Sequence, residues 1–208
     1  MTELLLIRHG LCDAIGRTIV GRSAGVSLNA VGVRQAEDLA DRLKLLPIAA
    51  VYSSPMERTW ETAAPLAGRL NLPVRLAAGL NELDFGAWTG RTLDSLKGEP
   101  DWTRFNTQRG STRIPGGETM DEVVARSGAE LARIAAEHPV GLVAAVSHGD
   151  VIRALLAHYA GMPLDLMLRL EVAPASVSAV RLAPEPLVMA VNWRTDGIGS
   201  LDLRIRRS

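Results

Sequence analysis

The sequence predicts an α/β protein: a three-layer sandwich in which a mainly parallel central sheet carries helices on both faces and ends in an antiparallel edge. Short, continuous apolar runs, typical of strands buried on both faces of a parallel sheet, occur at residues 4–7, 48–52 and 142–146. Helical patterns lie between these runs, and strands that alternate with helices indicate a parallel sheet covered on both sides. Near the end of the chain, segments 177–182 and 187–193 flank Pro184-Glu185-Pro186, which predicts a hairpin at the sheet edge.

Capping residues mark where the first two helices are expected to begin. Asn29 precedes a segment whose apolar residues recur every three or four positions, so that one helix face should bury Val33, Ala36, Leu39, Ala40 and Leu43. Ser54 is expected to cap the second helix, because Pro55 suits its first turn and Glu57 is placed to close a capping box.

The middle of the chain is predicted to be loop-rich. A short strand is expected at residues 74–76, and residues 81–115 form an irregular stretch with several glycines and tryptophans. Long loops inside compact domains are more often functional than idle. We therefore expect residues 83–118 to form a cap or insertion over the active site of a single domain spanning residues 1–208.

Two further helices are predicted after this stretch. Thr119 and Glu122 form a second capping box, and the helix that they begin should run to about Glu137. The segment 151–159 is expected to be helical and directly follows a strand.

Composition excludes several functional classes. Lys plus Arg (23) equals Asp plus Glu (23) in this chain of 208 residues, so its net charge does not favour binding to nucleic acid or to a membrane. The terminal Arg204, Arg206 and Arg207 are expected to be a solvated tail. No apolar run approaches the roughly 20 residues that span a bilayer. A single cysteine, Cys12, precludes an internal disulfide, and the start of the chain lacks a signal peptide, so a cytoplasmic location is expected.

Two predicted strands end in a His-Gly pair. His9 and Gly10 follow the first strand, and His148 and Gly149 follow the strand at 142–146. Since ligands of open α/β sheets bind where strands end and helices begin, the two histidines are expected to meet at one site. Either pair alone is weak support, because a lone histidine at a strand end is more often structural.

The residues around these pairs suit the hydrolysis of a phosphate monoester. Without a metal ion, that reaction needs cationic donors, a nucleophile and an acid for the departing oxygen. Neutral His9 can be the nucleophile, and arginines such as Arg8 and Arg58 bind phosphoryl oxygens in a planar fork. Glu82 is the best candidate acid, because partial burial between Leu80 and Leu83 should raise its pKa. Asp84 is the second candidate acid, and Cys12 is a weaker alternative nucleophile.

Four segments, in order, resemble the signature segments of the histidine phosphatase superfamily, the phosphoglycerate mutase-like proteins. They are Leu6-Ile7-Arg8-His9-Gly10, Tyr52 to Ala63, Asn81 to Trp88 and Val146-Ser147-His148-Gly149. The resemblance covers nearly the whole chain, and four motifs in register are far more specific than any one of them.

The resemblance implies a two-step mechanism. His9 would attack phosphorus, while Arg8, Arg58 and His148 hold the peripheral oxygens and Glu82 protonates the leaving oxygen. Water would then release the phosphoryl group, with Glu82 acting as base. Neither a metal ion nor another cofactor is expected.

One departure from the family pattern concerns phosphate binding. Cys12 and Ile15 stand where the family often has Ser or Thr and then a phosphate-binding Asn. Arg22 is our candidate replacement, with Arg17 equally placed on sequence grounds. We expect the substrate-binding residues to be Gly10, Gly21, Arg22 and Gly149.

Three functions are compatible with these residues. The favoured one is a metal-independent, acid-type phosphatase that acts on a small cytoplasmic phosphomonoester. The alternatives are a phosphoglycerate-type mutase, disfavoured because the region after Glu82 is compact, and a non-catalytic phosphate-binding module. The sequence selects no substrate and leaves the pH optimum and a homodimeric state open.

Overall fold

A six-stranded mixed sheet forms the centre of the molecule, as the sequence predicts. The computed structural model describes residues 1–182 and 185–196. The strands are β1 (Thr2–Arg8), β2 (Ile48–Ser53), β3 (Val74–Leu76), β4 (Gly141–Ser147), β5 (Val177–Arg181) and β6 (Leu187–Trp193), in the order β3-β2-β4-β1-β5-β6. The first four are parallel, whereas β5 runs antiparallel to β1 and β6 antiparallel to β5. The expected antiparallel edge is therefore confirmed.

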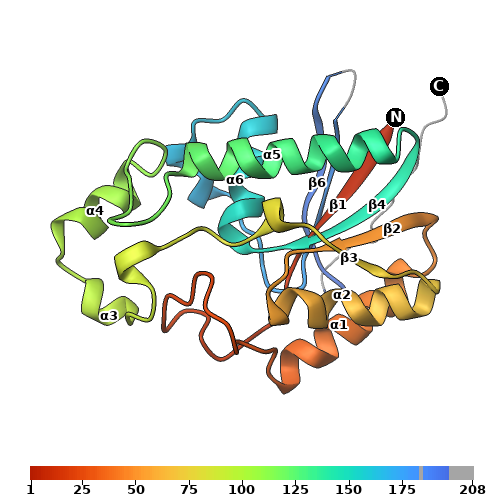
Figure 1. Ribbon diagram of the computed structural model, residues 1–208, viewed down its shortest axis with the longest axis horizontal. Coiled ribbons are helices and arrows are strands. Elements are labelled where there is room, and N and C mark those ends of the chain that lie inside the picture. The colour runs from red at the N-terminus through yellow and green to blue at the C-terminus, as the bar shows by residue number, and fades with distance from the viewer. Residues whose placement is uncertain (183–184, 197–208) are drawn as a thin grey trace.

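Helices cover both faces of the sheet (Figure 1). Helices α1 (Ala30–Leu43) and α2 (Glu57–Leu70) pack together on one face, and α5 (Met120–Glu137) and α6 (Gly149–Tyr159) pack on the other. Successive side chains of β1 point to opposite faces, so Leu4 and Leu6 join the core under α5 and α6. Leu5 joins the core under α1 and α2. Each such buried side chain contributes about 1.5–3 kcal/mol.

The first helix begins where its cap predicts, but one core residue differs. The Asn29 side chain accepts hydrogen bonds from the N–H groups of Val31 and Gly32. Val33, expected to be buried, is 49% exposed, and Gly32 takes the inner position of the first turn. Helix α1 lies so close to the preceding loop that a Cβ on Gly32 would come 2.1 Å from the Leu11 carbonyl oxygen. The helical periodicity of the sequence allowed Val33 to be a core residue. Only glycine at position 32 fits the close contact with Leu11.

The capping-box predictions have opposite outcomes. Thr119 and Glu122 make both hydrogen bonds of the box at the start of α5, as expected. The box predicted for Ser54 and Glu57 is wrong, because α2 begins at Glu57 after Met56, a residue that has no capping oxygen. The Ser54 hydroxyl instead contacts two residues far away in the sequence, described with the site below.

The stretch after Leu80 is more regular than predicted. It follows the 3₁₀ turn η1 (Ala78–Leu80) and contains η2 (Gly86–Trp88), α3 (Leu93–Leu96) and α4 (Pro100–Thr107). The Trp88 ring packs edge-on against Trp102 and Phe105, at centroid distances of 5.3 and 5.4 Å. This aromatic cluster gives α3 and α4 a small core of their own, at one end of the molecule in Figure 1.

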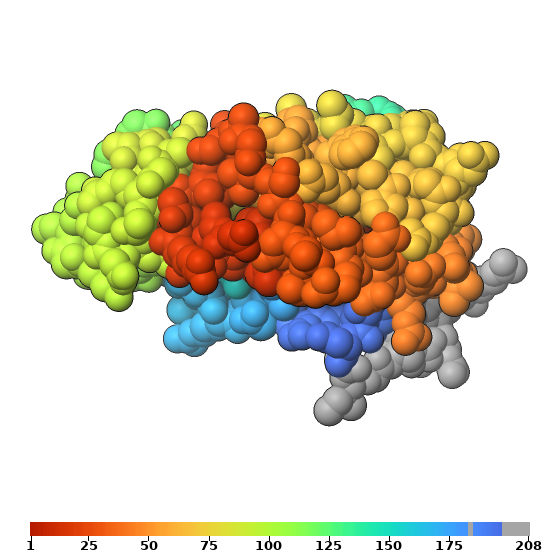
Figure 2. Space-filling view, turned by 90° about the horizontal axis from the view of Figure 1, so that it is seen from below, coloured from red at the N-terminus to blue at the C-terminus, as the bar shows by residue number. Residues whose placement is uncertain are grey.

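The loop from residue 10 to residue 29 lies beside this small core. Figure 2 shows the loop in red between the yellow-green α3–α4 segment and the orange α1. Backbone hydrogen bonds join the two segments, from Ile19 N–H to the Arg91 carbonyl and from Leu93 N–H to the Arg17 carbonyl. The remaining regular element is η3 (Leu164–Arg169).

Two sequence predictions lie outside the described residues, namely part of the Pro184-Glu185-Pro186 turn and the terminal Arg204, Arg206 and Arg207. Among the helices of the described residues, none combines the length and apolar character that crossing a membrane requires.

Candidate active site

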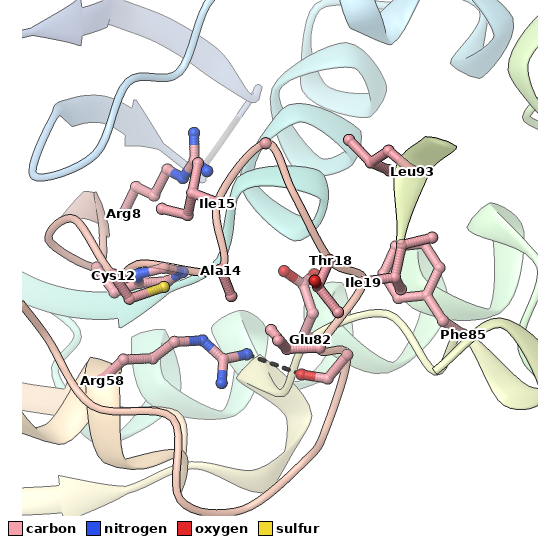
Figure 3. A pocket seen from close by; sticks show the side chains of 14 residues that line it. Arg8, Cys12, Ala14, Ile15, Thr18, Ile19, Arg58, Glu82, Phe85 and Leu93 are labelled. Atoms are coloured by element: carbon pink, nitrogen blue, oxygen red, sulfur yellow. Dashed lines mark hydrogen bonds between the residues drawn. The ribbon is translucent and has the colours of Figure 1, made fainter. Parts of the chain in front are cut away.

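The predicted site residues converge at the carboxyl ends of the parallel strands. Arg8 pairs with Ser147 in the β1–β4 register, so His9 and His148, each one residue further on, are neighbours with ring centroids 5.4 Å apart. Ser54 follows β2, and Glu82 follows β3 and η1. A pocket of about 160 Å³ opens here, and Arg8, His9, Arg58 and Glu82 are among its lining residues (Figure 3).

His9 is held as a neutral imidazole with one defined tautomer. Its ring is buried, and Nδ1 lies 2.8 Å from the Gly10 carbonyl oxygen. A carbonyl only accepts, so Nδ1 carries the proton and Nε2 keeps the lone pair. Burial, together with the positive charges of Arg58 and Arg8, lowers the pKa of His9 to about 3. His9 is therefore an available nucleophile across the physiological pH range.

Two arginines place positive charge around this imidazole. Arg58 is fully buried in the first turn of α2, where the helix dipole already disfavours a cation. Its Nη2 donates to the Gly21 carbonyl oxygen at 2.8 Å, and Arg8 Nη1 donates to the Val172 carbonyl oxygen at 2.6 Å. Arg8 Nε, Arg58 Nε and Arg58 Nη1 are buried and have no hydrogen-bond partner among the described residues. Such orphaned donors beside a pocket fit an oxyanion ligand.

His148 belongs to a chain of hydrogen bonds that fixes its tautomer. Arg58 Nη2 lies 3.2 Å from His148 Nδ1, and because a guanidinium only donates, Nδ1 is the acceptor. Nε2 therefore donates to Ser54 Oγ at 2.9 Å, and this hydroxyl donates to Asn81 Oδ1 at 3.0 Å. Burial, together with His9 and Arg58, lowers the pKa of His148 well below its ordinary value. Sequence reasoning missed Ser54 and Asn81, since Ser54 matched a helix cap.

Glu82 is a carboxyl whose environment favours the protonated form. Its side chain is 14% exposed, and Oε2 lies 3.8 Å from His148 Nδ1. Burial raises the pKa of Glu82 to about 7, helped by the negative charge of Asp150 and opposed by a hydrogen bond from Leu83 N–H. The pKa rise expected from its apolar neighbours is thus present. Asp84, the second candidate acid, is 42% exposed on its side chain and accepts a hydrogen bond from Gly86 N–H. It is not among the residues lining the pocket.

Arg22 lies beside Glu82 and is not among the residues that line the pocket, so a direct contact of Arg22 with substrate stays a prediction. Its Nε donates to the Glu82 carbonyl oxygen at 2.9 Å, and its Nη2 lies 2.8 Å from Glu118. Arg126 donates to the same Glu82 carbonyl and to both oxygens of Glu118. We call Arg22, Glu118 and Arg126 the Glu82 clamp. Nε and Nη2 of Arg22 are thus engaged within the protein.

The three predicted glycines have identifiable steric or backbone roles. A Cβ on Gly10 would come 2.7 Å from the Gly32 carbonyl oxygen, so the close approach of α1 requires glycine at this position. A Cβ on Gly149 would come 3.1 Å from the Arg8 guanidinium, so Gly149 makes room for that side chain. Gly21 has a φ of +48° and holds Arg58 through its carbonyl. Direct substrate contact by these residues stays a prediction.

Residues of the 10–29 loop complete the pocket. Cys12 and Ile15 both line the pocket. They occupy the positions at which the family often has Ser or Thr and then Asn. From the 83–118 segment, Phe85 and Leu93 reach the pocket, whereas Trp88 and Trp102 lie in the aromatic cluster.

Asp150 and Arg109 are buried neighbours of the site that sequence reasoning missed. Arg109 lies 3.0 Å from Asp150 and stacks over the Phe105 ring at 4.3 Å. Burial would raise the pKa of Asp150, but the charges of Arg109 and Arg153 lower it overall. Asp150 is thus ionised, and its charge helps to keep Glu82 protonated. The sequence feature that could have identified Asp150 is its position directly after Gly149.

Together these groups suit a tetrahedral oxyanion. The site offers a neutral imidazole, two guanidinium groups with orphaned donors and a carboxyl able to exchange a proton near pH 7. Within residues 1–182 and 185–196, no three His, Cys, Asp or Glu side chains cluster as metal ligands would.

Comparisons with known proteins agree with this geometry. The model of the histidine phosphatase superfamily (branch 1) matches residues 4–193. A bifunctional protein of Mycobacterium tuberculosis is 36% identical over 181 residues, which are 85% of this chain and 50% of that protein, so this chain spans about half the length of that relative. The probable phosphoglycerate mutase GpmB of Proteus mirabilis is 33% identical over 206 residues, 97% of this chain and 94% of that protein. The alpha-ribazole phosphatase from Shigella flexneri has a similar structure, with a TM-score of 0.82, 27% identity and coverage of 95% of this chain and 100% of that one.

Proposed function

Since this chain belongs to the histidine phosphatase superfamily, we propose that it is a metal-independent phosphatase whose His9 Nε2 takes the phosphoryl group of a small phosphate monoester. The observation that carries the proposal is the fixed tautomer of His9. Its Nδ1–H donates to the Gly10 carbonyl, which leaves the Nε2 lone pair available. The guanidinium groups of Arg8 and Arg58 supply the positive charge that a metal ion would otherwise bring.

In the first step, the Nε2 lone pair of His9 attacks phosphorus and the P–O ester bond breaks. The electron pair of that bond stays on the leaving oxygen, which takes the proton of Glu82. Arg8 and Arg58 bind the peripheral phosphoryl oxygens through their orphaned donors. His148 contributes a third contact once its Nδ1 is protonated, a change that a bound dianion favours.

In the second step, a water molecule attacks phosphorus and gives a proton to the Glu82 carboxylate. The P–N bond breaks, and its electron pair returns to Nε2 of neutral His9. Inorganic phosphate leaves, and both His9 and Glu82 regain their starting protonation states.

The test is hydrolysis of 4-nitrophenyl phosphate in excess chelator. We expect the wild type to release phosphate and His9→Ala to lose turnover by several orders of magnitude. Cys12→Ala is the matched variant, since Cys12 lines the same pocket and was the alternative nucleophile. Activity that persists in His9→Ala, or that disappears in Cys12→Ala alone, contradicts the proposal.

A mutase is the second candidate, favoured by the 33% identity to a probable phosphoglycerate mutase. A mutase returns the phosphoryl group to a bound product and must exclude water. Incubation with 3-phosphoglycerate distinguishes the two, because only a mutase yields 2-phosphoglycerate. A non-catalytic binding module would bind vanadate without either reaction.

A further inference from the structure

The part of the pocket beyond the phosphoryl-binding residues is apolar. Its lining there consists mainly of Ala14, Ile15, Ile19, Val20, Phe85 and Leu93. In Figure 3, Phe85 and Leu93 lie at the end of the pocket away from Arg8 and Arg58. The wall that a leaving group bound against Nε2 of His9 would contact is therefore mainly hydrocarbon. Apolar contact of this kind favours binding by about 25 cal/mol per Å².

The charges that face the pocket are already used by the reaction. Among the described residues that line it, the cationic side chains are Arg8 and Arg58, and the carboxyl group is that of Glu82. Arg22, beside Glu82, is paired with Glu118, and Arg109 is paired with Asp150. A carboxylate on the leaving group would lie against apolar walls and near Glu82, and an unpaired charge in such a place is costly.

A small amount of polar character remains in the pocket. Thr18 places a hydroxyl among the lining residues, beside Glu82 in Figure 3. A hydroxyl can pair with a neutral polar group, such as an alcohol, but does not balance a full negative charge.

We propose that this pocket selects monoesters whose leaving group is uncharged and mainly apolar next to the ester oxygen, and that it discriminates against leaving groups bearing a carboxylate. This proposal rests on the proposed phosphatase function and narrows its substrate class. It places phosphorylated hydroxy acids, phosphoglycerates included, among the poor substrates.

The test compares n-butyl phosphate with 3-phosphooxypropanoate, two alkyl monoesters of similar length that differ at the far end of the leaving group. We expect kcat/KM to be at least about tenfold higher for n-butyl phosphate. Leu93→Lys places an ammonium at the far wall and should reverse or abolish this preference. Leu45→Lys is the matched control, because Leu45 is 79% exposed after α1 and outside the pocket. If Leu93→Lys does not fold, Val20→Lys provides the second position.

Binding provides a readout that does not depend on turnover. Calorimetry on His9→Ala should show tighter binding of butylphosphonate than of 3-phosphonopropanoate. Equal or better hydrolysis and binding of the carboxylate compounds would overturn the selectivity and leave the phosphatase function standing. If neither ester is hydrolysed while butylphosphonate still binds more tightly, the phosphatase function fails and the pocket preference stands.

Discussion

At the scale of single residues, the site depends on groups kept in unusual protonation states. Burial holds His9 neutral with a pKa of about 3 and raises the pKa of Glu82 to about 7. The imidazole of His9 is therefore unprotonated at neutral pH, whereas the Glu82 carboxyl titrates in the working range. Pairs of titratable groups whose pKa values are shifted in opposite directions in this way are typical of acid–base chemistry.

The pH dependence of kcat/KM should follow Glu82. Its folded-state pKa lies above the ordinary value, so the protonated acid is present below about pH 7 and is lost as the pH rises through 7. His9 loses its neutral form only near pH 3, so it should not limit the rate between pH 4 and 7. We expect kcat/KM for n-butyl phosphate to fall above pH 7 in the wild type, and this alkaline limb to vanish in Glu82→Gln.

Leaving-group chemistry separates an acid from a merely structural residue. Glu82→Gln should lower kcat/KM for n-butyl phosphate by about 10²–10⁴. The loss for 4-nitrophenyl phosphate should be much smaller, because that leaving group needs no proton. Equal losses for the two esters would show that Glu82 does not donate the proton.

Sequence reasoning succeeds for residues whose neighbours in the chain determine their environment. Glu82 lies between two buried leucines, so its burial could be predicted, and the two His-Gly pairs marked two strand ends. Arg22 could not be assigned, because its partners Glu82 and Glu118 are distant in the chain. Ser54 was misassigned for the same reason: its partners Asn81 and His148 come from other strand ends.

At the scale of secondary-structure elements, close backbone contacts and ion pairs orient the catalytic segments. The strand ends were predictable from apolar runs, whereas α4 was missed because its eight residues bury a single side chain, Phe105. The tight contact of α1 with residues 10 and 11 was also invisible in the sequence, since a helical pattern does not report how near another backbone lies.

Gly32→Ala tests that contact. The new Cβ would lie 2.1 Å from the Leu11 carbonyl oxygen, which is backbone and cannot move cheaply. We expect the free energy of unfolding to fall by about 1–3 kcal/mol or more, measured by urea denaturation. Gly128→Ala, within α5 and with no atom of the described residues within 4 Å of the new Cβ, should instead raise it by about 0.5–1 kcal/mol. Similar effects for both variants would contradict the close approach.

Arg22→Ala tests the Glu82 clamp. Removing the guanidinium leaves Arg126 as the remaining arginine partner of both the Glu82 carbonyl and Glu118. We expect kcat for n-butyl phosphate to drop by about tenfold or more with little change in KM, since a misplaced acid weakens the transition state. As for Glu82→Gln, 4-nitrophenyl phosphate should be affected less. Arg17→Ala is the matched control, because Arg17 is exposed and outside the pocket. A rise in KM alone would support Arg22 as a direct substrate contact.

At the scale of the whole molecule, the fold gathers buried positive charge at one end of the sheet. The alternation of strands and helices made the sandwich predictable, and the parallel order brings all four strand ends to one edge. The free-energy cost of burying these charged groups could not be predicted from the sequence. Arg58 is fully buried at a helix N-terminus and, like Arg8, has donors without a partner among the described residues. Such groups oppose folding unless a ligand compensates them.

Binding of an oxyanion should therefore stabilise the entire domain. At a vanadate concentration of about 100 Kd, linkage adds roughly 2.7 kcal/mol to the free energy of unfolding. For a domain of this size, that increment corresponds to a rise in Tm of about 5–10 °C, measurable by calorimetry in excess chelator. Arg58→Met should lose most of this rise, because it removes a guanidinium that faces the pocket. Arg69→Met removes another arginine of α2, which pairs at the surface with Glu37 and Asp41 of α1. This variant should keep the rise in Tm. An equal rise in both variants would mean that the oxyanion binds elsewhere, and that the buried charge of Arg58 serves the fold rather than the ligand.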